Sequence, residues 1–328
     1  MTDIRTPWDL APDGTIVELA GIEVDNLLGF LALLGLLRAL EHAQPGWEPK
    51  ASWVGPPWRA RLHVAAKVDQ AAIADAASSG ILAIADKLEV DGRKNVDFAD
   101  RAELREYALA QRKEQVGAAL VASLGTEWPT KKDGKPYAGP LVMMFGQGHQ
   151  NFLERLVAVP RGELPNRMSK LKHPPDLASA GTIAKALFEP WERSDNTDGF
   201  RWDPEDDQRY ALRFGNPSKA GAAATVHGAN RLAAVGFLSY PTSPTAARVV
   251  ARGTARNRRD WYFVWPIWSS PTCLAGVEAL LGHPDLVRGK LDRLRPLGVE
   301  EIYRARRIAN GKFMNVTRAM PMRERGAT

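Results

Sequence analysis

The longest apolar stretch of the chain predicts a buried helix. From Leu27 to Leu37, hydrophobic side chains fall on every side of a helix, a pattern typical of a helix that is buried all round. Asp25 or Asn26 supplies the side chain that caps the first turn, and the helix continues to about His42. The run holds 11 residues, too few to cross a bilayer, which takes about 20. We therefore expect a core helix and no transmembrane segment.

Two glycines interrupt this apolar run. Gly29 and Gly35 lie six residues apart, and a residue without a Cβ lets another element approach closely. We expect a second element to pack against the helix at these positions.

The rest of the pattern predicts short strands and helices in no regular order. The expected strands cover residues 15–20, 59–64, 141–145, 209–214, 248–253 and 261–267. The expected helices cover residues 68–88, 101–124, 178–191, 220–235, 272–281 and 299–308, with another that begins near residue 151. The loops expected from Pro, Gly and polar residues cover 45–57, 130–140, 160–175 and 194–205. This order favours an α+β fold of mixed helices and short, mainly antiparallel strands.

Length and composition fit a globular protein. The chain has 328 residues, 45% hydrophobic and 25% charged, which allows a sizeable core. We expect one compact unit over residues 1–328, with an N-terminal lobe over 1–160 and a basic C-terminal lobe over 175–328.

Positive charge is concentrated near the C-terminus. From Arg248 onward there are 16 Lys and Arg against 7 Asp and Glu, whereas the whole chain carries a net charge of +6. Such a basic quarter is typical of a surface that contacts phosphates, and equally of a solvated surface that keeps a protein soluble.

Cysteine usage and the N-terminus indicate a reducing compartment. Cys273 is the only cysteine, so neither an intrachain disulfide nor a Cys-rich zinc site can form. The first 15 residues carry three aspartates and no apolar run, unlike a signal peptide. We expect a cytoplasmic protein.

The usual catalytic motifs are absent from the sequence. There is no G-x-x-x-x-G-K-[ST], no G-x-S-x-G and no pair of histidines at metal-ligand spacing. Cys273 follows Pro271 at a predicted helix start, where a thiolate is favoured, but an apolar-flanked cysteine is more typical of packing. We predict no catalytic residue, no cofactor and no metal.

A glycine-rich connection precedes the helix near residue 151. Gly146, Gly148 and Asn151 lie where backbone N–H groups at a helix N-terminus favour an anion. Asn151 stands in place of the third glycine of the dinucleotide fingerprint. The loop is therefore either a tight structural turn or a site for a nucleic-acid phosphate.

The strongest functional pattern is arginine beside aromatic residues. Arg252, Arg256, Arg258 and Arg259 surround the predicted turn at residues 254–260, and five aromatic residues follow by residue 268. Arginine with aromatic side chains suits phosphate contact combined with base stacking. The alternative is that the aromatic residues fill the core, and we expect both: buried aromatics and a turn that contacts nucleic acid.

Further basic residues extend this hypothesis. On the helix predicted after Gly298, Glu300 lies four residues before Arg304 and accounts for it as an ion pair, whereas Arg307 has Tyr303 at that position. A lysine-rich loop near residue 133 can reach into a groove, although such loops are also typically solvated. The predicted nucleic-acid-binding residues are Lys131, Lys132, Lys135, Arg252, Arg256, Arg258, Arg259, Arg307 and Lys312.

Five stretches resemble one family. Residues 25–38 (DNLLGFLALLGLLR) resemble the N-terminal segment of CRISPR effector large-subunit-like proteins, and further similarity lies in residues 206–213, 228–233, 263–268 and 308–315. Together they resemble the small large-subunit-like proteins of type I-U (type I-G) systems, some of which are joined to the helicase-nuclease. These motifs are structural, so the resemblance transfers no catalytic residue.

This resemblance implies a non-catalytic subunit of a type I CRISPR interference complex of the Cascade kind. There, guide-RNA pairing reads the sequence while protein subunits check the flanking motif and hold the displaced strand. The implied partners are DNA or guide RNA, other CRISPR effector subunits and the helicase-nuclease, with no membrane. Two alternatives stay open: an adaptor that binds guide RNA without reading DNA, and a nucleotide-dependent enzyme that uses the 146–152 loop.

Overall fold

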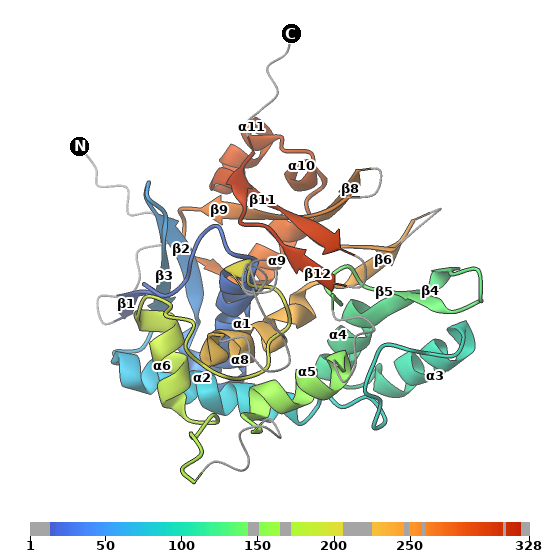
Figure 1. The fold of residues 1–328 in the computed structure, drawn as a ribbon. Helices are drawn as coiled ribbons and strands as arrows, with labels where there is room; N and C mark the ends of the chain where they lie inside the picture. The colour runs from blue at the N-terminus through green and yellow to red at the C-terminus, as the bar shows by residue number, and fades with distance from the viewer. Residues whose placement is uncertain are drawn as a thin grey trace.

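The computed structural model describes residues 14–143, 151–164, 172–205, 225–245, 249–257, 260–310 and 313–322. Figure 1 shows helices α1 and α8 in the middle of the molecule, between two sheets on one side and helices α2, α5 and α6 on the other. The predicted α+β fold with short, mainly antiparallel strands is confirmed. Within the described residues, no helix is long and apolar enough to cross a membrane.

Helix α1 (Leu27–Ala43) is the buried helix that the sequence predicts. The Asn26 side chain caps it by accepting a hydrogen bond from the Leu28 N–H at 2.9 Å. Its backbone meets that of α8 (His227–Gly236), because a Cβ added to Gly35 would lie 1.8 Å from the Leu232 carbonyl oxygen. The predicted close approach is thus confirmed at Gly35, whereas Gly29 lies against its own preceding loop.

The first sheet joins distant parts of the chain. Its strands follow the order β1-β3-β2-β10 and are all antiparallel; they are β1 (Thr15–Glu18), β2 (Lys50–Val54), β3 (Arg59–Val64) and β10 (Thr272–Cys273). The predicted strands at 15–20 and 59–64 are confirmed. The prediction that 45–57 is only loop was wrong, because the Pro and Gly residues at its two ends frame strand β2, in which Trp53 is buried.

The second sheet holds the basic C-terminal part. It has the order β12-β11-β9-β8, with β13 also paired to β11; its strands are β8 (Thr254–Asn257), β9 (Asp260–Trp268), β11 (Val299–Asn310), β12 (Phe313–Val316) and β13 (Met320–Pro321). Residues 254–257, predicted as part of a turn, form a strand of this sheet. The strand predicted at 248–253 is the short β7 (Val249–Ala251), which pairs with β6 (Thr242–Pro244).

The predicted helix at 299–308 is wrong, since these residues form β11. From Tyr303 to Arg306, buried and exposed residues alternate, which is the period of a strand. Strand β9 provides a long antiparallel partner for it. Glu300 therefore does not pair with Arg304; its carboxylate accepts a hydrogen bond from Ser269 at 2.8 Å.

The other helices cover the core. They are α2 (Gln70–Ala85), α3 (Arg101–Gln111), α4 (Gln115–Leu124), α5 (Phe152–Arg161), α6 (Ala180–Phe188), α9 (Leu274–Gly282), α10 (Pro284–Val287) and α11 (Leu291–Leu294). The single helix predicted over 101–124 is two helices, because Glu114 caps a new helix by accepting from the Gly117 N–H. Strand β10 takes the first two residues of the helix predicted at 272–281. Residues 141–143 form no strand, and the strand predicted at 209–214 lies outside the described residues.

One hydrophobic core joins the two expected lobes. Phe30 of α1 stacks on Trp265 of β9 with ring centroids 5.6 Å apart, and Trp53 of β2 meets Trp268 edge-on at 6.3 Å. Phe263, Trp265 and Trp268 are fully buried, as expected of the aromatic strand.

Candidate nucleic-acid interface

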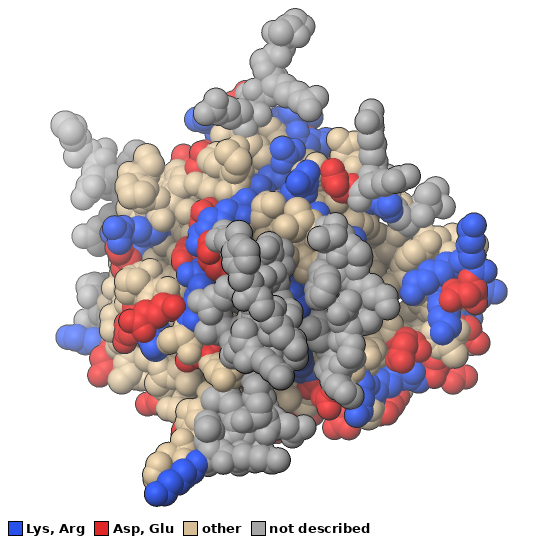
Figure 2. Space-filling model, in the orientation of Figure 1, with Lys and Arg blue, Asp and Glu red and all other residues tan. Residues whose placement is uncertain are grey.

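One end of the second sheet carries four arginines and two aromatic residues. We call this group the arginine–aromatic cluster: Arg256, Trp261, Tyr262, Arg304, Arg306 and Arg307. Antiparallel pairing of β8, β9 and β11 brings residues far apart in sequence into adjacent positions. Figure 2 shows Lys and Arg side chains gathered over the region of β11.

One face of this sheet end places Trp261 between two cations. Arg256 on β8 and Arg307 on β11 are both directly opposite Trp261 on β9. Each guanidinium carbon lies 5.5 Å from the centroid of the Trp261 ring, within cation–π range. The ring therefore holds two like charges near each other.

Arg307 is the more buried of these two cations. Burial, together with the charge of Arg256, lowers the pKa of Arg307 to about 10. Arg307 therefore stays charged at neutral pH, but its charged form is less stable than that of an exposed arginine. Its Nη1 donates a hydrogen bond to the Pro140 carbonyl at 3.3 Å, a neutral acceptor. An anion bound here would relieve the repulsion between the two arginines.

The opposite face carries the second half of the cluster. Because alternate strand residues face opposite sides, Tyr262, Arg304 and Arg306 lie on the other side of the sheet from Trp261. The Arg304 guanidinium lies 4.9 Å from the Tyr262 ring centroid, and Arg306 is directly opposite Tyr262. Both arginines are exposed.

No carboxylate neutralises the cluster in the part of the chain that the structure describes. None lies within 4.0 Å of its four guanidinium groups. Arg252 differs, because it forms an ion pair with Glu278 at 3.1 Å, and the same carboxylate also binds Arg38 at 2.7 Å. Arg252 thus lies in an internal ion-pair group, and its role in nucleic-acid binding stays a prediction.

The three predicted lysines lie on a hairpin. It is formed by β4 (Gly125–Thr130) and β5 (Pro136–Ala138), so the loop expected at 130–140 is largely the end of this hairpin. Lys131 closes the turn by donating its N–H to the Lys135 carbonyl at 2.8 Å, and Gly134 supplies the positive φ of 82° that the turn requires. Lys132 and Lys135 are exposed.

The glycine-rich connection is a weaker candidate for a phosphate site than its sequence suggests. The Phe152 N–H at the start of α5 donates to the Asn95 side chain at 3.1 Å, and the next two N–H groups donate to the Lys94 carbonyl. The Asn151 side chain is itself bonded to Asn95 and Glu154. These donors are therefore already used. Gly146 and Gly148 lie outside the described residues, as do Arg258, Arg259 and Lys312.

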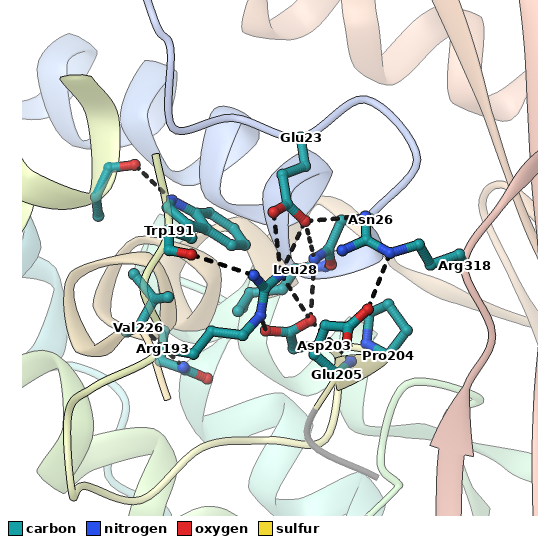
Figure 3. A network of polar contacts seen from close by, with 12 residues as sticks. Glu23, Asn26, Leu28, Trp191, Arg193, Asp203, Pro204, Glu205, Val226 and Arg318 are labelled. Atoms are coloured by element: carbon teal, nitrogen blue, oxygen red, sulfur yellow. Dashed lines mark hydrogen bonds and ion pairs between the residues drawn. The ribbon is translucent and has the colours of Figure 1, made fainter. Parts of the chain in front are cut away.

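A polar network near the start of α1 stabilises the fold (Figure 3). Arg193 binds Glu23 and Asp203, each at 2.8 Å, and Asn26 donates to the same two carboxylates. Burial opposes the charge of Glu23, but hydrogen bonds from Arg193 and Asn26 hold its pKa below the ordinary value. The network thus fixes segments that are distant in sequence.

Arg318 extends this network and is not a free cation. It forms ion pairs with Glu23, Asp25 and Glu205 at 2.8 to 3.1 Å. Part of the basic charge of the C-terminal quarter is therefore neutralised by ion pairs, whereas the four arginines of the cluster have no carboxylate within 4.0 Å among the described residues.

Residues with catalytic potential are scattered. Among the described residues, no group of three or more His, Cys, Asp and Glu could hold a metal ion. His63 Nε2 lies 2.8 Å from the Ser52 hydroxyl, but both residues are buried, and burial lowers the pKa of His63 to about 4. Cys273 is exposed, contrary to the packing interpretation.

Four residues of interest were missed by sequence reasoning. Arg304 and Arg306 were missed because β11 was interpreted as a helix; the alternation from Tyr303 to Arg306 was the available signal. Trp128 and Tyr137 on the lysine hairpin are 57% and 39% exposed, and nothing in the sequence distinguishes them from core aromatics.

The comparisons with known proteins found no match. No protein-family model matches the chain, and no curated protein or solved structure shows significant similarity to it.

Proposed function

We propose that this chain is a non-catalytic nucleic-acid-binding protein that contacts its ligand through the arginine–aromatic cluster. The observation that carries the proposal is a set of four arginines without a carboxylate partner among the described residues, three of which lie against two half-buried aromatic rings. Arginine presents planar donors that match phosphate oxygens. A polyanion would also relieve the repulsion between Arg256 and Arg307.

The biological setting that we propose is a type I CRISPR interference complex in the cytoplasm. There the chain would contact DNA, at the flanking motif or the displaced strand, and help to recruit the helicase-nuclease. The support is the family resemblance of residues 25–38, 228–233 and 263–268. These stretches belong to α1, α8 and β9, which share the core that supports the cluster.

The test is a salt titration of DNA binding. Each phosphate contact releases counterions, so log K falls with log salt by about 0.9 per contact on duplex DNA and about 0.7 on single strands. Replacing Arg256, Arg304 and Arg306 together with Ala should weaken binding and make this slope shallower by up to about 2.7 on duplex DNA and about 2.1 on single strands. These three are exposed, so thermal unfolding should change little.

A matched control comes from the same basic quarter. Arg288, Arg293 and Arg295 are 62 to 71% exposed but lie within 4.0 Å of Asp285 or Asp292, so their charges are already offset. The triple Ala variant at these positions should retain the wild-type slope. Equal slopes for both triple variants and the wild type would refute the proposal. Binding to a partner subunit with no binding to nucleic acid would favour the adaptor alternative.

A further inference from the structure

We propose that the β4–β5 hairpin and the Trp261 side of the arginine–aromatic cluster form one track for single-stranded nucleic acid. On this track, unpaired bases stack on Trp128 and Tyr137 while lysines and arginines contact the phosphates. The inference rests on the proposed function and adds the class of ligand.

Trp128 is held outward by the irregular pairing of the hairpin. Thr126 pairs with Tyr137 and Thr130 pairs with Pro136, so residues 127–129 have no counterpart on β5 and bulge from the ladder. The Thr126 hydroxyl donates to the Trp128 carbonyl at 2.7 Å, which fixes the bulge. Trp128 is thus 57% exposed.

The hairpin is basic as well as aromatic. It carries three lysines and two carboxylates: Glu127 is bound by Arg105, with Nε at 2.9 Å, and Asp133 accepts a hydrogen bond from the Lys135 N–H at 3.2 Å. The side chains of Lys131, Lys132 and Lys135 form no ion pair with any described residue. Exposed aromatics next to unpaired lysines match the combination that binds single strands, in which a charged groove follows the backbone and rings stack on bases.

The hairpin and the cluster are continuous. The Pro140 carbonyl, two residues beyond β5, accepts the hydrogen bond from Arg307 at 3.3 Å. The base of the hairpin therefore contacts Arg307, which lies directly opposite Trp261 on the neighbouring strand. Gly139 donates to the Leu124 carbonyl at 2.7 Å, and Thr242 donates to the Ala122 carbonyl at 2.6 Å, which anchors this base. Figure 1 shows the hairpin pointing outward from beside the ends of β11 and β12.

Stacking selects single strands. In a duplex the base faces are covered by neighbouring bases, so only unpaired bases can lie against Trp128 or Tyr137. A strand that passes from the hairpin to Trp261 would therefore bind more tightly than a duplex of the same length.

The test uses the full chain with two labelled probes, a 20-nucleotide thymidine oligonucleotide and a 20-base-pair duplex. The double variant Trp128→Ala, Tyr137→Ala should bind the single strand at least about thirtyfold more weakly and bind the duplex less than about twofold more weakly. Its salt slope should equal that of the wild type, because stacking involves no counterion release. The variant Trp128→Phe, Tyr137→Phe should bind nearly as the wild type does.

Two further variants sharpen the result. Replacing the three hairpin lysines with Ala should instead make the salt slope on single strands shallower by about 0.7 for each lysine that touches a phosphate. Leu109→Ala removes an apolar side chain that is 52% exposed on α3 and should change neither affinity nor slope. Thermal unfolding of every variant should match that of the wild type.

The outcomes separate this inference from the proposed function. If the wild type binds through the cluster but the aromatic double variant binds both probes as the wild type does, the inference alone is overturned. Equal losses of affinity for single strand and duplex also overturn it. If the wild type binds neither probe, the proposed function fails and the inference fails with it.

Discussion

The contact between α1 and α8 predicts a large loss of stability for Gly35→Ala. The added Cβ would lie 1.8 Å from the Leu232 carbonyl oxygen, which is 1.2 Å short of the 3.0 Å below which real Cβ contacts are essentially never found. The obstacle is backbone, so α8 must move as a whole, and all of its residues are buried.

The magnitude follows from two opposing terms. Overpacking a core typically costs about 1–3 kcal/mol and occasionally more, whereas Gly→Ala within a helix gains about 1 kcal/mol. Because a whole buried helix must shift here, we expect overpacking to cost about 4 kcal/mol, above the typical range, which leaves a net loss of about 3 kcal/mol in the free energy of unfolding.

Urea denaturation followed by circular dichroism measures this loss as a lower midpoint at an unchanged slope. Gly46→Ala is the matched control, because Gly46 has no atom within 4 Å of an added Cβ, and it should unfold as the wild type does. A Gly35→Ala protein whose stability lies within about 1 kcal/mol of the wild type would show that the two helices do not meet as described.

Two further predictions concern the core. Leu33 is fully buried, so Leu33→Asp places an unpaired charge in the core at a cost of several kcal/mol. We expect insoluble protein or the loss of a cooperative thermal transition. Normal melting of this variant would contradict the core position of Leu33. Burial lowers the pKa values of His63 and His227 to about 4, so the unfolded chain binds more protons below pH 6.5 and stability is lost as the pH falls from about 6.5 toward 4. Each histidine changes the free energy of unfolding by up to about 1.4 kcal/mol per pH unit. Urea titrations at pH 7, 6 and 5 should therefore show falling stability, and the fall should be smaller in the His63→Asn variant. A stability that does not change with pH would contradict the burial of both histidines as neutral groups.

The central helix could be predicted from the sequence because its signal is local. Continuous apolar residues and a capping Asn26 specify α1 without reference to the rest of the chain. Strand β11 could not be predicted in this way. Its glutamates, arginines and alanines are strong helix formers, and pairing with β9 overrides that preference.

The candidate site was predictable in part. Arg256 and Arg307 follow from charge and neighbouring aromatics, but their meeting at Trp261 depends on strand register, which couples residues about fifty positions apart. Which arginines lack a carboxylate partner is likewise a property of the tertiary structure: Arg252 and Arg318 are equally basic in sequence, yet both form ion pairs.

The proposal that the arginine–aromatic cluster binds nucleic acid is tested most directly by photo-cross-linking of bound DNA, with the modified peptides identified by mass spectrometry. Cross-links form only at side chains that touch the ligand, so the method reports the interface itself, with single-stranded and duplex probes used side by side. We predict adducts on the peptides that contain Trp261 and Tyr262 and on those spanning residues 299–308. Adducts found only elsewhere, for example on α2 or on residues 288–297, would contradict the assignment of the arginine–aromatic cluster as the binding surface.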